Sequence, residues 1–325
     1  MIRGGTMEPH SGKVAVLLSV YNGEKYLRDF LDSLVAQTFK DFVLWVRDDG
    51  SADHSVNTIR EYQDRLRIDW VDESSGNLGV KRSFDRLLAH ASSKTNHLYF
   101  MFADQDDIWL PHKIRDTLAE MRAWETRYPG NPILIHTDLS VCNETGEIIS
   151  DSFWRYQKLN PDRIELNRLL VQNVVTGCTM MLNRPLAEIV RPIPQTCIMH
   201  DWWIALAACG LGRIGYLGKS TILYRQHGSN TIGAKGFTLR TLWAKLFEPL
   251  SLTPFARQAL CFYDTYGQWL SEIDKEQTDV FSRLPRFRFW QRVRIIRKYR
   301  FYKHGFLRTL NFILKNWKLR EGAKQ

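Results

Sequence analysis

The chain has 325 residues, and its 45 lysines and arginines outnumber its 35 acidic residues, which gives a net charge of +10. Thirteen of the basic residues, and no aspartate or glutamate, lie between Arg283 and Arg320, so the rest of the chain is close to neutral. This distribution excludes a nucleic-acid binder that is basic throughout. Hydrophobic residues make up 44% and charged residues 25%, so the chain can bury a core.

Five scattered cysteines without a C-x-x-C pair argue against a disulfide framework and against a cysteine metal site. They favour a reducing, cytoplasmic setting. Residues 1–12 lack the apolar core of a signal peptide and are expected to form a flexible leader, with the start at either Met1 or Met7. No run of apolar residues is long enough to predict a transmembrane helix.

The first part of the chain alternates apolar strands with amphipathic helices. Continuous apolar runs predict four buried strands, over Val14–Val20, Phe42–Val46, Ile68–Val71 and Leu98–Phe102. Apolar spacings of three and four predict the helices that follow them, over Glu24–Gln37, Ser55–Leu66, Lys81–Ala91 and Pro111–Arg127. This alternation predicts an α/β domain with a mostly parallel sheet, which binds ligands at the carboxyl ends of its strands.

The alternation loosens after Ile133–Asp138. Strands are expected over Gly177–Leu182 and Thr221–Tyr224, and a helix over Trp202–Cys209. From Thr238 the pattern is helical to the end of the chain.

Three carboxylates, from Asp104, Asp106 and Asp107, follow the fourth expected strand. Like charges this close repel one another unless a cation neutralises them. Oxygen ligands suit Mg²⁺ or Mn²⁺, which often bridges to a substrate phosphate. A solvated acidic turn that caps the next helix is the simpler alternative. The position at the end of a strand favours a cation that clamps a diphosphate.

Two further clusters lie near ends of expected elements. Asp48-Asp49-Gly50-Ser51 could accept hydrogen bonds from a nucleobase or ribose, although Asp-Gly is also a turn signal. Lys81 and Arg82 follow Asn77-Leu78-Gly79, and they either contact phosphate or form an ordinary solvated helix start.

A third cluster, His200-Asp201-Trp202-Trp203, begins a helical stretch. Asp201 is a candidate general base, with the tryptophans against a sugar face. The alternative is a helix-capping aspartate with core tryptophans. In the later segment Tyr224–Asn230, His227 is a candidate metal ligand and Arg225 a phosphate contact, although a lone histidine is more often structural.

Taken in order, these segments resemble glycosyltransferase family 2, the inverting enzymes of GT-A fold. Four motifs carry the resemblance over about residues 13–235: VAVLLSVYNGEKYL, VRDDGSADHS, FADQDDIWLP as the D-x-D element, and HDWW, where the family usually has a Glu-Asp pair. The later stretches LLVQNVVTGCTMMLNRP, MHDWWIALAACGLGRIGYL and TILYRQHGSNTIGA look like the bacterial rhamnosyltransferase branch.

The resemblance implies a role for each matching residue, with His200 standing where the family usually has Glu. Asp201 would be the catalytic base, and Asp106 the main metal ligand, joined by His227. Trp202 and Trp203 would shape the acceptor pocket. The nucleotide sugar would be held by Ser19, Tyr21, Asp49, Lys81 and Asp104.

The implied enzyme has a GT-A catalytic domain over residues 13–237 and a helical region over 238–325. Mg²⁺ or Mn²⁺ would neutralise the leaving nucleoside diphosphate, while Asp201 deprotonates the acceptor hydroxyl in one inverting displacement. The expected donor is dTDP-L-rhamnose, with a UDP-hexose as the alternative. The expected acceptor is a saccharide or lipid-linked saccharide of a cell-surface polysaccharide. A homodimer is left open.

The basic segment from Arg283 to Arg320 also contains nine aromatic residues, and Leu307, Leu310, Ile313 or Leu314, and Trp317 recur at helical spacing. Lysines and arginines among aromatic residues suit an anionic membrane surface, so we expect peripheral attachment to the inner face of the cell membrane. A helix packed on the catalytic domain is the alternative. A different class, a nucleic-acid-binding protein that uses this segment, is disfavoured by the clustered carboxylates. A Rossmann dehydrogenase is disfavoured as well, because no G-x-G-x-x-G motif follows the first expected strand.

Overall fold

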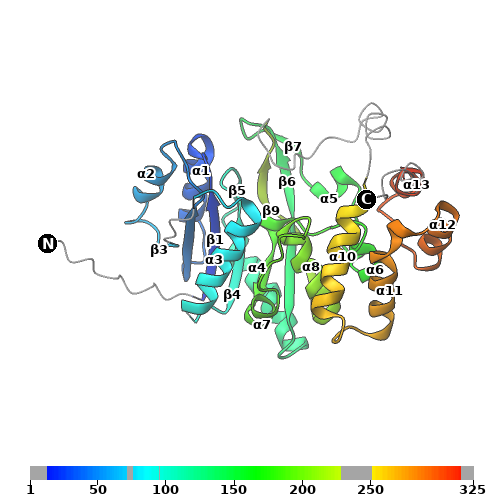
Figure 1. Cartoon of the computed structure of the whole chain (residues 1–325). Helices are drawn as coiled ribbons and strands as arrows, with labels where there is room; N and C mark the ends of the chain where they lie inside the picture. The colour runs from blue at the N-terminus through cyan, green and yellow to red at the C-terminus, as the bar shows by residue number, and fades with distance from the viewer. Residues whose placement is uncertain (1–12, 72–75, 95, 228–250, 316–325) are drawn as a thin grey trace.

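A nine-stranded sheet lies at the centre of this computed structural model, which describes residues 13–71, 76–94, 96–227 and 251–315 (Figure 1). The strand order is β3-β2-β1-β4-β8-β6-β9-β5, and β7 pairs with the end of β6. The expected leader, residues 1–12, and the expected domain boundary at 237/238 lie outside the described residues.

One half of the sheet is parallel. Strand β1 pairs with β2 and β4, and β2 pairs with β3, all in the same direction. These strands are β1 (Val14–Val20), β2 (Phe42–Asp48), β3 (Ile68–Trp70) and β4 (Tyr99–Ala103). Their carboxyl ends therefore meet at one edge of the sheet, where the polar segments predicted to bind ligands begin.

The other half mixes directions. Strand β8 runs antiparallel to both β4 and β6, whereas β6 and β9 are parallel, and β5 returns antiparallel to β9. The bounds are β5 (Ile108–Trp109), β6 (Ile133–Cys142), β7 (Ile148–Ser150), β8 (Met181–Asn183) and β9 (Arg213–Arg225). The β5–β9 pair joins the segment after the acidic cluster to the strand that leads to His227.

Helices cover both faces of the sheet, and β1 is therefore buried on both sides. Ala15 and Leu17 belong to one apolar core, and Val16 and Leu18 to the other. The helices that precede residue 228 are α1 (Glu24–Val35), α2 (Ser55–Arg60), α3 (Val80–Lys94), α4 (Lys113–Arg127), α5 (Phe153–Gln157), α6 (Leu166–Leu169), the short η1 (Gly177–Thr179), α7 (Arg184–Ile189) and α8 (His200–Leu211).

The helices after residue 250 pack on the core that contains Ala15 and Leu17. The ring of Trp203 on α8 meets Phe262 at 5.8 Å and Tyr266 at 5.5 Å between centroids. These later helices are α10 (Thr253–Tyr266), α11 (Glu272–Ser282), the short η2 (Leu284–Arg286), α12 (Phe289–Lys298) and α13 (Phe306–Lys315). None of the described helices is long and apolar enough to cross a bilayer.

The predicted α/β architecture with a helical C-terminal region is confirmed, and the differences are local. The strand expected over Gly177–Leu182 is a helical turn followed by the short β8, and β9 begins at Arg213 rather than Thr221. The early part of β9 contains Gly215, where an added Cβ would lie 2.4 Å from the Trp124 ring. Because glycines interrupt this strand, its apolar pattern is too weak to predict it.

Candidate active site

Carboxylates from distant parts of the sequence meet beyond the end of β4. Burial raises the pKa of the Asp104 carboxyl above its ordinary value, and the neighbouring charges of Asp106 and Asp201 raise it further. Asp201 thus lies within electrostatic range of the acidic cluster, although it comes from the first turn of α8. The structure therefore brings the expected base and the expected cation-binding loop into one site.

Asp201 is half-buried, and its environment suits proton transfer. Burial raises its pKa to about 7, and hydrogen bonds from the backbone of Trp202 and Gly177 oppose that rise. The Trp202 N–H donates to the Asp201 Oδ1 at 2.6 Å, which fixes the carboxylate at the helix start. A carboxyl that titrates near neutrality and is held in place can act as a general base.

His200, the residue before the expected base, lies in an apolar environment. Its ring is 5% exposed and lies 4.5 Å from Phe84 and 5.4 Å from Phe102 between centroids. Burial lowers its pKa to about 3, so the imidazole is neutral at physiological pH. The residue that replaces the family's usual glutamate is therefore a packing group, and it brings no charge beside Asp201.

Asp106 and His227 lie in contact. The His227 Nε2 is 2.8 Å from the Asp106 Oδ2, across 121 positions of sequence. Arg225 fixes the Asp106 backbone, because its Nε donates to the Asp106 carbonyl at 3.2 Å while another guanidinium nitrogen donates to Asp29 at 2.6 Å. The His227 ring also packs on Tyr26 at 4.8 Å. A carboxylate oxygen and an imidazole nitrogen at this spacing fit two ligands of one divalent cation.

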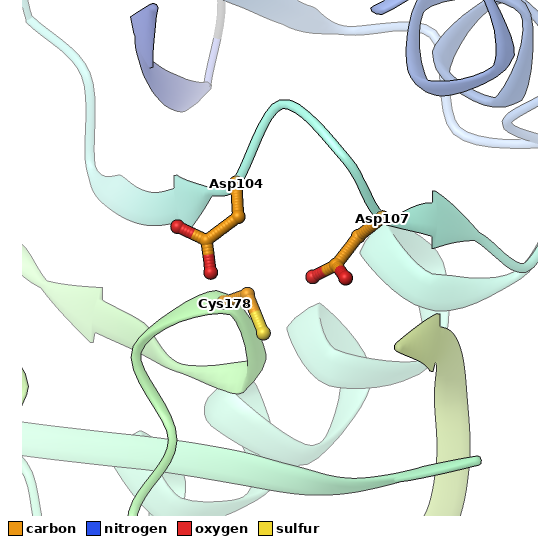
Figure 2. Close-up of side chains that lie close together, drawn as sticks. All are labelled: Asp104, Asp107 and Cys178. Atoms are coloured by element: carbon orange, nitrogen blue, oxygen red, sulfur yellow. The ribbon is translucent and has the colours of Figure 1, made fainter. Parts of the chain in front are cut away.

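A second group of potential ligands lies behind the loop. Figure 2 shows the carboxylates of Asp104 and Asp107 facing the thiol of Cys178, and the ligand atoms lie within 4.8 Å of one another. Asp107 and Cys178 are buried, and burial raises the pKa of the Cys178 thiol well above its ordinary value. The nearby charge of Lys113 is also buried. A protonated thiol beside an ammonium group fits Mg²⁺ or Mn²⁺ less well than the Asp106–His227 pair.

Gln105 has a role that the sequence did not reveal. Its Oε1 accepts from the Tyr21 N–H at 3.0 Å, and its Nε2 donates to the Tyr21 carbonyl at 3.0 Å. The side chain thus ties the end of β1 to the acidic loop. Gly23 completes the contact, because an added Cβ would lie 2.4 Å from the Gln105 side chain. Only the position of Gln105 between two aspartates could have suggested this.

The residues expected to bind the nucleotide sugar lie on neighbouring elements, and several already have internal partners. The Ser19 hydroxyl donates to the Ser83 Oγ at 2.6 Å. The buried Asp49 pairs with Arg47 and accepts from the backbone of Leu78 and Gly79 at 2.7 and 2.8 Å. Asp49 therefore organises the loop before α3. The Tyr21 side chain is 49% exposed and available to a ligand.

Lys81 is engaged with the segment that precedes the base. Its Nζ donates to the carbonyls of Gln195 and Cys197 at 2.7 and 2.8 Å. At the next residue, the Ile198 N–H donates to the buried Gln258 Oε1 of α10 at 2.8 Å. In this arrangement two hydrogen bonds of the Lys81 ammonium go to the segment before α8, and the expected contact with a diphosphate stays a prediction.

Replacing Lys81 by methionine separates these two roles. If Lys81 positions the segment before Asp201, kcat falls about tenfold and the dissociation constant of the donor nucleotide stays unchanged. If it binds the diphosphate, the donor affinity falls instead. Steady-state kinetics and calorimetric titration measure both quantities, with Arg60→Met at an exposed position of α2 as the control.

The two tryptophans after the base are packing residues. Trp203 has no exposed surface, and its indole N–H donates to the Val190 carbonyl at 3.2 Å. Its burial does not fit the expected acceptor contact, so Trp203 belongs to the core. Trp202 is half-buried, donates to the Leu169 carbonyl at 2.6 Å and packs edge-on to Phe255. Only the remaining surface of Trp202 can meet an acceptor.

Comparison with known proteins gives one consistent result. The family model described as "Glycosyl transferase family 2" matches residues 15–189, which is more than half of the chain. An uncharacterised glycosyltransferase of Nostoc is 27% identical over 225 residues, which is 67% of this chain and 66% of that protein. The dTDP-rhamnosyl transferase RfbG of Shigella flexneri is 25% identical over 227 residues, covering 67% of this chain and 74% of that protein.

Solved structures agree with the fold. The structure of S. aureus TarS in complex with UDP-GlcNAc superposes with a TM-score of 0.53 and 15% identity, covering 89% of each chain. At this identity the likeness shows the fold alone, and it confirms the expected GT-A architecture. The matched part of the chain holds the acidic loop but ends before Asp201 and His227.

Proposed function

Because the chain belongs to glycosyltransferase family 2, we propose that it transfers a sugar from a nucleotide sugar to an acceptor hydroxyl with inversion of the anomeric carbon. The observation that carries this proposal is that the charges of Asp201 and of Asp106 both act on the Asp104 carboxyl, so the expected base lies near the expected cation-binding loop. A base must lie beside the cation-binding loop for the acceptor oxygen to attack the sugar opposite its diphosphate. Transfer is tested by incubating the protein with donor and acceptor and following release of the nucleoside diphosphate.

Asp201 performs the proton transfer in this proposal. The carboxylate accepts the proton of the acceptor hydroxyl while that oxygen forms its bond to the anomeric carbon, and the bond to the diphosphate breaks. The backbone N–H of Trp202 holds the Oδ1 oxygen. The buried surround keeps the pKa near 7, so the carboxylate is basic enough to remove the proton as the bond forms.

The pH dependence of kcat/KM follows from this pKa. Asp201 works only when it is deprotonated, so activity is expected to be flat above about pH 7 and to fall tenfold per unit below it. Rates measured between about pH 5 and 9 at saturating cation test this limb. Asp104, whose pKa is also raised, is the competing source. The Asp104→Asn variant should lower the rate but keep the fall in activity below pH 7. If that fall disappeared in this variant, it would be assigned to Asp104 instead of Asp201.

Asp106 and His227 would hold a divalent cation, Mg²⁺ or Mn²⁺. When bound, the cation would neutralise the negative charge of the leaving diphosphate. The chain prepares this place through Arg225, which fixes the Asp106 backbone, and through Tyr26, which packs on the His227 ring. The convergence of half-buried Asp106 and His227 from two segments supports this proposal over a solvated acidic turn.

The donor we propose is dTDP-L-rhamnose, and the acceptor a saccharide or lipid-linked saccharide. The name of the Shigella relative supports the rhamnosyl donor at 25% identity. A UDP-hexose is the alternative. Titration with a panel of dTDP- and UDP-sugars in the presence of Mn²⁺ decides between them, because a site built for a donor discriminates strongly against a sugar that leaves its polar groups unpaired. Equal affinity for both nucleotides would refute the rhamnosyl assignment.

A further inference from the structure

Helix α13 has apolar residues on two opposite sides. Phe312 is 1% exposed and packs into the core, while Phe306, Leu307, Leu310 and Leu314 are 78%, 54%, 37% and 47% exposed. With 3.6 residues per turn, these four side chains fall within an arc of about 100°, and Phe312 lies on the other side of the helix. We call the four exposed residues the α13 stripe. One side of the helix thus anchors it to the protein, and the α13 stripe faces solvent.

Most aromatic residues of the basic segment do not share this exposure. Phe301 and Phe312 are buried, and Phe287, Phe289 and Tyr299 are half-buried. The expectation that aromatic residues throughout the segment meet a membrane is therefore too broad. Trp317, which was expected to continue the helical pattern, lies outside the described residues. Among the described aromatics of the segment, Trp290 and Phe306 are the ones that are mainly exposed.

The segment that precedes α13 in the chain is strongly basic. The sequence has no aspartate or glutamate between Arg283 and Arg320. Two of its basic residues are neutralised from α11, where Asp279 pairs with Arg283 and Glu276 with Lys298. The others that are exposed in the described part of the chain are Arg286, Arg288, Arg294, Arg297 and Arg300.

We propose that the α13 stripe, together with these arginines, docks on the surface of an anionic lipid bilayer. An amphipathic helix with apolar residues on one side and basic residues around it lies in the plane of a lipid interface, with its apolar side among the acyl chains. The anionic headgroups attract the arginines. A nucleic acid would use the arginines but not the stripe, and a second copy of the chain would bring the same positive charge to the contact.

Co-sedimentation with lipid vesicles tests the docking without measuring transfer, so it is independent of the proposed activity. The full chain is expected to bind vesicles of phosphatidylcholine with about a quarter phosphatidylglycerol, and to bind pure phosphatidylcholine much more weakly. Phe306→Ser/Leu307→Ser is expected to weaken binding to the anionic vesicles about tenfold or more. Arg294→Gln/Arg297→Gln is expected to weaken it about twenty-fivefold, since each charge contributes about fivefold.

The matched control is Ile273→Ser, which removes an apolar residue that is 68% exposed on the acidic helix α11. This control is expected to bind as the parent does, and the melting temperature of every variant verifies its fold. Equal binding of the parent and the Phe306/Leu307 variant would overturn the proposal. A parent protein that does not bind the anionic vesicles would also overturn it. Dimerisation through α13 in sedimentation, or binding of a labelled oligonucleotide, would then identify the other partner.

Discussion

The Asp201→Asn variant is expected to lose about three orders of magnitude in kcat while it binds the donor nucleotide as the parent does. The amide keeps the size and the hydrogen bond from the Trp202 N–H, but it cannot accept the proton of an acceptor hydroxyl. General-base catalysis contributes roughly 10²–10⁴ to enzyme rates, and a base with a pKa near 7 is well matched to neutral pH. Single-turnover transfer and calorimetric donor titration measure the two quantities separately.

Two further variants make this result specific. Asp201→Glu keeps the basic group and is expected to recover part of the rate, because it moves the carboxylate without removing it. Asp64→Asn changes the same chemical group at an exposed position after α2 and is expected to transfer normally. Full activity of Asp201→Asn would reject the base assignment, and a parallel loss of donor affinity would show that Asp201 supports the binding site instead.

Local sequence patterns predicted the strands and helices of the first part of the chain and the edge of the sheet where the candidate site residues lie. The run Val14–Val20 could only be a strand buried on both faces, and β1 is such a strand. Because parallel strands end at one edge, the sequence also predicted that the segments after β1, β2 and β4 gather there. The mixed direction of β8 could not be predicted, since a three-residue strand carries no signal of its orientation.

The roles of individual polar residues were harder to predict, because they depend on partners far along the chain. Lys81 has the composition of a phosphate contact, yet its hydrogen bonds go to Gln195 and Cys197. Asp49 likewise supports the backbone of the next loop. No local pattern shows which partner such a side chain finds. The burial of Trp203 was equally hard to predict, because residues that cover its ring come from α10, far along the chain.

The helices after residue 250 connect two of these features. Gln258 of α10 accepts a hydrogen bond from the Ile198 backbone, next to the segment that carries the base, and α13 presents its stripe to solvent. The helical region after residue 237, which the sequence placed outside the GT-A domain, therefore helps to fix the segment before Asp201. Removal of this region is expected to impair the catalytic core as well as any docking, so point substitutions are the informative tests.

The contact between Asp106 and His227 leads to the second large effect. Asp106→Ala is expected to lower transfer by about three orders of magnitude and to abolish the Mn²⁺ dependence of donor binding, because the leaving diphosphate then lacks its cation. His227→Ala is expected to cost about tenfold. Asp64→Ala serves as the control, and Mn²⁺ titration of each variant, followed by the paramagnetic signal of the free ion, measures the affinity.

The double variant decides whether the two side chains hold the same ion. If they do, His227→Ala adds little once Asp106 is absent, and the losses are strongly non-additive. If His227 serves only to orient Asp106 through the 2.8 Å contact, the His227→Gln variant should bind Mn²⁺ as tightly as the parent, since the amide can keep that hydrogen bond. An unchanged Mn²⁺ affinity in Asp106→Ala would place the ion elsewhere. The group of Asp104, Asp107 and Cys178 would then be the candidate, and Co²⁺ binding with a thiolate absorption band would identify it.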